Sequence, residues 1–227
     1  MNVKNKLGFY SSISTVVLTL ITFGIAILTP PFSGPYCKGS CFVYPYLDIA
    51  SRFPRDYYWI FPAMFLMIAY LVLMVCIHRW ASGEKKIYSQ IGLYFALMSA
   101  FVLISDYFVQ LSVIQPSLLN GETDGISMLT QYNPHGIFIV LEELGFIFMS
   151  VSFLFLAFVF SDGKLQKAIR WTFASAFVLT AVAFIAYSTI YGLSREYRFE
   201  VASISINWLA LIVSGILLAV IFNNEKK

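Results

Sequence analysis

Long apolar runs, separated by short polar stretches, recur along the whole chain. A helix that crosses a bilayer needs about 20 mostly apolar residues. Six runs reach this length, and they lack the alternation typical of strands in a membrane barrel. The pattern predicts an all-α polytopic protein, a single domain over residues 1–227. Its six transmembrane helices are expected at Leu7–Thr29, Tyr57–His78, Ile87–Ile114, Pro134–Phe160, Ile169–Tyr191 and Val201–Phe222.

The composition supports this class. Hydrophobic residues make up 59% of the chain and charged residues 12%, against roughly 25% charged in ordinary soluble domains. This excludes a typical soluble domain and a disordered protein. The net charge of +3 is too small to indicate nucleic-acid binding. The bilayer is therefore the first expected partner.

Basic residues fall unequally on the two sides of the predicted helices. Ten lie on one side: Lys4, Lys6, Arg79, Lys85, Lys86, Lys164, Lys167, Arg170, Lys226 and Lys227. Five lie on the other: Lys38, Arg52, Arg55, Arg195 and Arg198. Loops rich in Lys and Arg stay in the cytoplasm. We therefore expect a multi-pass cell-membrane protein with both termini cytoplasmic.

Two of the three cysteines, Cys37 and Cys41, share one short polar loop on the predicted outer side. A disulfide can join them if this loop faces an oxidising compartment; the alternative is two free thiols. No Cys/His cluster with the spacing of a zinc site occurs, so the sequence predicts no metal and no cofactor.

Acidic side chains occur inside the predicted helices, where they usually face a protein interior or a cavity. Asp106 lies eight residues before the end of the third span, and Glu142 eight residues after Pro134. At 1.5 Å per residue both are about 12 Å deep, and Asn207 is about 9 Å deep in the sixth span. The sequence predicts that polar groups from three helices meet at one level.

The helical faces extend this candidate site. Gln110 shares the Asp106 face of the third span at a four-residue step, and His135 shares the Glu142 face near the start of the fourth. Glu143 points about 100° away from Glu142. One glutamate is therefore expected to face a cavity and the other a neighbouring helix.

No Lys or Arg lies at the depth of these acids, so a counter-charge must come from elsewhere. Arg52 and Arg55, before the second span, and Arg195 and Arg198, before the sixth, can fold over the cavity mouth. A bound cation is another source. The loop from Gln115 to Asn133 is long for a plain connection; it is either a lid over the cavity or a mobile loop.

No motif of a known reaction occurs: there is no GxSxG, HExxH, Walker or GxGxxG sequence. The leading hypothesis is therefore an outward-facing acidic cavity that binds a small cationic or amphiphilic ligand, with proton-coupled transport as its extension. A second hypothesis is a lipid-modifying enzyme with Glu142 and Asp106 as an acid–base pair. A third is a non-catalytic subunit whose acids meet a basic residue of a partner, or of a second copy.

Overall fold

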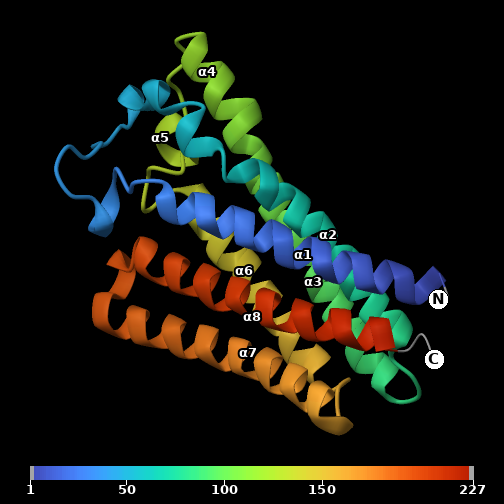
Figure 1. Cartoon of the computed structure of the whole chain (residues 1–227). Helices are drawn as coiled ribbons and strands as arrows, with labels where there is room; N and C mark the ends of the chain where they lie inside the picture. The colour runs from blue at the N-terminus through green and yellow to red at the C-terminus, as the bar shows by residue number, and fades with distance from the viewer. Residues whose placement is uncertain (1–2, 225–227) are drawn as a thin grey trace.

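The computed structural model describes residues 3–224, which form a bundle of helices without strands (Figure 1). Six helices are long and apolar enough to cross a membrane, which confirms the predicted all-α class and the six helices of spanning length. Lys226 and Lys227 of the charge count lie outside the described residues. The long helices are α1 (Val3–Leu28), α2 (Ile60–Trp80), α3 (Lys85–Val109), α6 (Ile137–Ala157), α7 (Gly163–Tyr191) and α8 (Tyr197–Asn224).

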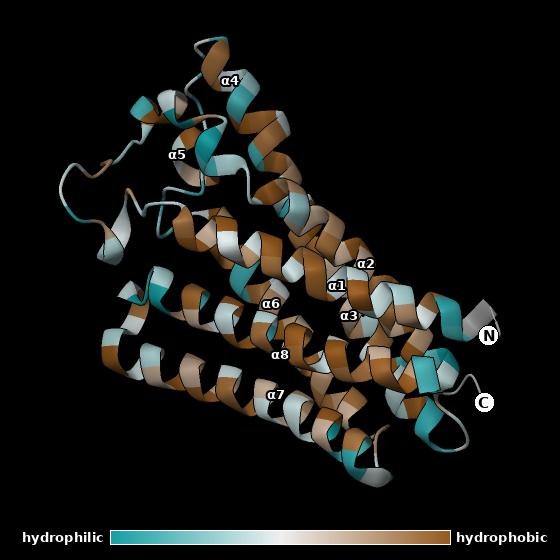
Figure 2. Cartoon of the chain, viewed as in Figure 1, coloured by the Kyte–Doolittle hydropathy of each residue, from teal (hydrophilic) through white to brown (hydrophobic). Residues whose placement is uncertain are grey.

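The long helices pack as a closed ring. Each contacts the next in the order α1, α2, α3, α6, α7, α8, and α8 returns to α1. Helix α6 also contacts α8 across the ring. Both ends of the chain lie at the same end of the bundle (Figure 1). Figure 2 shows apolar residues along the middle of the helices and polar ones gathered at both ends.

The opposite end of the bundle, called the loop end below, consists of residues 29–59, 120–136 and 192–196. It contains the short helix α5 (Ile126–Leu129) and 3-10 turns at Gly34–Tyr36, Leu47–Arg52, Arg55–Tyr57 and Gly192–Ser194. Cys37 and Cys41 form a disulfide here, whereas Cys76 is a buried free thiol in α2.

Several helix boundaries differ from those expected. Helix α3 does not end near Ile114: a π-helical turn, Gln110–Ile114, joins it to α4 (Gln115–Leu119). Pro116 lies at the start of α4 and lacks the N–H needed for a regular helical bond, which fits the wider turn before it. Helix α6 does not begin at Pro134: its N-cap is Gly136, and Asn133 Oδ1 accepts a hydrogen bond from the His135 amide (2.9 Å).

Small residues allow α3 and α6 to approach closely. A Cβ atom on Gly145 of α6 would lie 2.5 Å from Leu103 Cγ of α3, closer than van der Waals contact. Further from the loops, Ser152 Oγ of α6 donates a hydrogen bond to the Gly92 carbonyl of α3 (2.7 Å). The α3–α6 contact thus depends on the missing side chain of Gly145.

We therefore expect Gly145→Ala to lower the free energy of unfolding by about 1–3 kcal/mol, because a close-packed interface must shift to admit the methyl group. Gly24→Ala in α1 is the matched control, since a Cβ there has no heavy atom within 4 Å. Thermal unfolding in one detergent compares the two. An unchanged melting temperature for Gly145→Ala contradicts the close contact.

Candidate functional site

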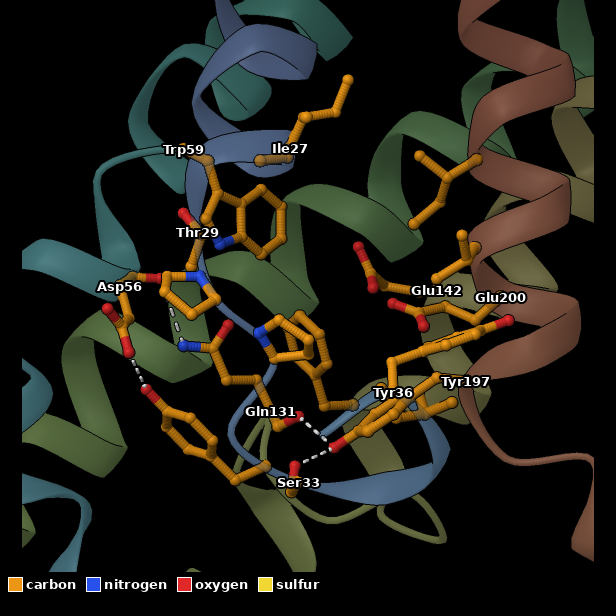
Figure 3. A pocket seen from close by; sticks show the side chains of 18 of the residues that line it. Ile27, Thr29, Ser33, Tyr36, Asp56, Trp59, Gln131, Glu142, Tyr197 and Glu200 are labelled. Carbon is orange, nitrogen blue, oxygen red and sulfur yellow. Dashed lines mark hydrogen bonds between the residues drawn. The ribbon is translucent and has the colours of Figure 1, made fainter. Parts of the chain in front are cut away.

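A cavity of about 420 Å³ opens at the loop end of the bundle. It lies between the end of α1 and the start of α8, with α6 behind them, and residues 131–132 close one side (Figure 3). Its wall is mostly apolar and aromatic. The side chains used below are Ile27, Ser33, Tyr36, Asp56, Trp59, Gln131, Tyr132, Glu142, Tyr197, Glu200, Val201, Ile204, Ser205 and Trp208.

Two glutamates from different helices meet in this cavity. Glu142 of α6 is 1% exposed and Glu200 of α8 is 9% exposed. Their side chains face one another in Figure 3. Two carboxylates buried side by side repel each other, and a proton held between them removes that repulsion, because a protonated carboxyl group donates and a carboxylate accepts.

Tyr107 of α3 fixes the position of the pair from behind. Its buried hydroxyl donates a hydrogen bond to Glu142 Oε1 (2.8 Å). Trp59 and Phe138 pack against the Tyr107 ring, with ring centroids 5.2 and 6.2 Å away. Glu142 is thus held by a side chain that is itself tightly packed.

Asp106 lies next to Tyr107 and near Glu142, as the sequence predicted, but it does not line the cavity. Asp106 is buried, and its Oδ2 has no hydrogen-bond partner among the described residues. Asp106 is thus a neighbour of the carboxyl pair that a ligand in the cavity does not reach directly.

Aromatic rings surround the carboxyl pair. Trp59, Tyr36, Tyr197 and Trp208 all line the cavity. Trp208 is 1% exposed, and its indole N–H has no hydrogen-bond partner among the described residues. Rings of this kind attract cations through their faces.

A second polar network joins the start of α2 to the 120–136 segment. Asp56 is buried and accepts hydrogen bonds from Arg52 Nε (2.8 Å), Arg52 Nη2 (3.1 Å), Arg55 Nη1 (3.3 Å) and the Tyr132 hydroxyl (2.8 Å). The hydrogen bond to Asp56 raises the pKa of Arg52, and burial raises the pKa of Tyr132. Both groups therefore keep their ordinary charge at neutral pH.

Hydrogen bonds close the cavity wall between three loop segments. The Tyr197 hydroxyl bonds Ser33 Oγ (2.7 Å) and donates to the Gln131 carbonyl (3.1 Å) (Figure 3). Gln131 Nε2 donates to the Asp56 carbonyl (3.4 Å). The 115–133 segment therefore supplies part of the cavity wall and is anchored there.

Gln110 anchors this segment and does not line the cavity, which corrects its assignment as a ligand-binding residue. Its Nε2 donates to the Leu129 carbonyl (2.6 Å), and its Oε1 accepts from the Gln131 amide (3.0 Å). Its role is to hold residues 129–131 in place.

Three other predicted site residues also lie away from the cavity. Glu143 pairs with Arg195, with Nη2–Oε2 at 2.6 Å, on the far side of α6. This hydrogen bond raises the pKa of Arg195. Asn207 donates to the Ser203 carbonyl (2.8 Å) and to Thr180 of α7 (3.3 Å). The His135 side chain is 59% exposed and lies 3.8 Å from Glu196.

The arginines expected over the mouth have specific partners. Arg195 does compensate one predicted acid, Glu143. Arg52 and Arg55 instead pair with Asp56, and Arg198 lies 3.6 Å from Glu196 and over the Tyr191 ring. None of the four contacts Glu142 or Glu200 in the described hydrogen bonds and ion pairs. The carboxyl pair thus has no basic partner.

The depths predicted for Glu142 and Asn207 were wrong, because α6 and α8 begin at other residues than expected. Glu142 follows the first residue of α6 by five positions, about 8 Å, and Asn207 follows that of α8 by ten, about 15 Å. Asn207 bonds Thr180 of α7 and does not line the cavity, although the next residue, Trp208, does. Glu200 instead meets Glu142, because α8 begins at Tyr197, four residues before the expected start, and so includes Glu200.

The sequence reasoning missed Glu200, Tyr107, Asp56 and Trp208. Glu200, Ser203 and Asn207 follow three- and four-residue steps, so an α8 extended backward by one turn places Glu200 on a polar face. This spacing was the signal in the sequence that could have identified Glu200.

Among the described residues, no group of three His, Cys, Asp or Glu side chains is arranged to hold a metal ion.

Comparison with known proteins adds no family: no family model, curated protein or solved structure matches this chain. The functional argument therefore depends on the cavity itself.

Proposed function

We propose that this chain is an integral membrane protein whose cavity binds a small organic cation through Glu142 and Glu200. The observation that carries this proposal is the buried carboxyl pair without a basic partner. No Lys or Arg is among the described residues that line the cavity. An ammonium group supplies both the missing positive charge and the hydrogen-bond donors that two carboxylates accept.

Charge balance links this binding to protons. A carboxyl pair with one shared proton carries one negative charge. Loss of that proton adds a second negative charge, and an ammonium group between the two carboxylates cancels it. Binding with release of one proton thus leaves the buried charge unchanged, which limits the cost of desolvation. This exchange supports proton-coupled transport as the extension of the proposal.

The enzyme hypothesis receives less support from the geometry. An acid–base pair must reach the reacting atoms within hydrogen-bond distance. Asp106 does not line the cavity, so Glu142 and Asp106 do not face one substrate together. For the subunit hypothesis, Arg195 of this chain already neutralises Glu143, so that acid needs no basic residue from a partner.

We also propose that both termini face the cytoplasm. The disulfide lies at the loop end, and among the described residues eight basic side chains belong to the opposite end of the bundle, against five at or next to the loop end. Glu122→Cys at the loop end should react with an impermeant maleimide on intact cells, whereas Ser82→Cys should react only after lysis. Native background is low, because Cys76 is buried and the other two cysteines are bonded. The reverse labelling pattern contradicts this orientation.

Three ligands with the same chain and different charge test the function: octylammonium, octan-1-ol and octanoate. Trp59 and Trp208 line the cavity, so their fluorescence reports binding in lipid nanodiscs, with empty nanodiscs as the partition control. We expect saturable binding of octylammonium at least about tenfold tighter than octanol, as for a buried charged hydrogen bond, and none of octanoate. Equal affinities for octylammonium and octanol contradict the proposal.

A further inference from the structure

The cavity has an apolar side that reaches the outer surface of the bundle. Ile27 of α1 and Val201 of α8 both line the cavity, and they are 68% and 44% exposed. Ile204 and Ser205, one turn further along α8, also line it and are half-buried. These residues belong to two helices that are long and apolar enough to span a membrane. The cavity thus opens sideways, between α1 and α8, where lipid would cover the protein.

The two sides of the cavity differ in chemistry. Figure 3 places Ile27 across the cavity from Glu142 and Glu200. The charged head of a ligand is therefore favoured on one side, and a hydrocarbon chain on the other. The indole N–H of Trp208 is a donor only and cannot bond an ammonium group, so the acceptors for the head are the two glutamates.

The side of the cavity at the loop end, which faces water, is closed by more polar contacts than the side between α1 and α8. There the Tyr197 hydroxyl bonds Ser33 Oγ and the Gln131 carbonyl, and the Tyr132 hydroxyl donates to Asp56. No comparable polar link joins Ile27 to Val201, whose side chains are aliphatic. An amphiphile therefore meets fewer interactions to break when it enters from the bilayer than through the loop end.

We propose that the cavity takes its ligand from the bilayer, and that this ligand is an amphiphile with a primary ammonium head group and an alkyl chain that leaves between α1 and α8. The inference rests on the proposed function, since it assigns the head group to Glu142 and Glu200. A primary ammonium fits better than a quaternary one, because the two carboxyl groups need N–H donors and a quaternary nitrogen has none.

A dodecylammonium probe with a photoreactive diazirine in mid-chain tests the route. After irradiation in nanodiscs, mass spectrometry locates the adducts that excess octylammonium removes. We expect them on peptides that contain Ile27 and residues 201–205. Adducts confined to residues 29–36 and 131–132 would overturn the lateral route while leaving the proposed function intact. Adducts that octylammonium does not remove, or that persist in the double variant Glu142→Gln, Glu200→Gln, contradict both proposals.

A pair of variants tests the opening without touching the acids. Ile27→Trp adds a ring at the opening, whereas Leu28→Trp adds one at a position that is exposed but does not line the cavity. We expect Ile27→Trp to slow labelling by at least about tenfold, as for an added ring in a close-packed passage, and Leu28→Trp to leave the rate unchanged. Equal rates in both variants would overturn the lateral route.

Discussion

Glu142→Gln combined with Glu200→Gln is expected to weaken octylammonium binding by about 30-fold to 1000-fold, which corresponds to the roughly 2–5 kcal/mol lost when one side of a buried charged hydrogen bond is removed. Glutamine keeps the size of each side chain but removes the negative charge that an ammonium group needs. Fluorescence titration in nanodiscs measures the affinity. Each single variant should retain part of it, because one carboxylate remains.

The control for charge is Glu122→Gln, which removes one acid from an exposed position at the loop end. We expect it to bind octylammonium like the wild type. The double variant should unfold at a temperature equal to or above that of the wild type, since it no longer buries a carboxyl pair. A folded double variant that binds with wild-type affinity contradicts the assignment of these two residues.

Asp56→Ala is expected to lower the free energy of unfolding by about 3 kcal/mol, at the lower end of the roughly 3–5 kcal/mol for breaking a buried ion pair. Asp56 is 1% exposed, but Arg55 is 58% exposed and is partly screened by water. The loss comes mainly from Arg52 and from the Tyr132 hydroxyl, which both lose their acceptor. Denaturation by sodium dodecyl sulfate measures the free energy.

Asp124→Ala provides the matched control, because it removes an exposed acid at the same end of the bundle. Its unfolding free energy should lie within about 0.5 kcal/mol of the wild type. Asp56→Asn should fall between the two, since an amide oxygen still accepts from Tyr132. If Asp56→Ala matches the Asp124→Ala control, the network does not hold the start of α2 to the 120–136 segment.

Hydrophobic length was enough to predict the six helices, because a run of about 20 apolar residues has few other stable states. The angular argument for Glu142 and Glu143 also held. In the structure Glu142 faces the cavity, and Glu143 faces Arg195 on another side of α6. One residue along a helix changes direction by about 100°, so this separation follows from the helix alone.

The precise helix ends were not predictable from hydrophobicity. The sixth span was expected to begin at Val201, which left Glu200 outside it, whereas α8 begins at Tyr197. Gln110 was assigned to the cavity because it shares the face of Asp106, but neither residue lines the cavity, and Gln110 bonds the Leu129 carbonyl. Both errors depend on tertiary contacts that hydrophobicity does not encode. The sequence therefore indicated an acidic cavity but named only one member of its carboxyl pair.

An experimental structure with octylammonium bound tests the central claim most directly. The account predicts the ammonium nitrogen within hydrogen-bond distance of both Glu142 and Glu200, with the alkyl chain passing Ile27. An ammonium group bound elsewhere, with no contact to either glutamate, would contradict it.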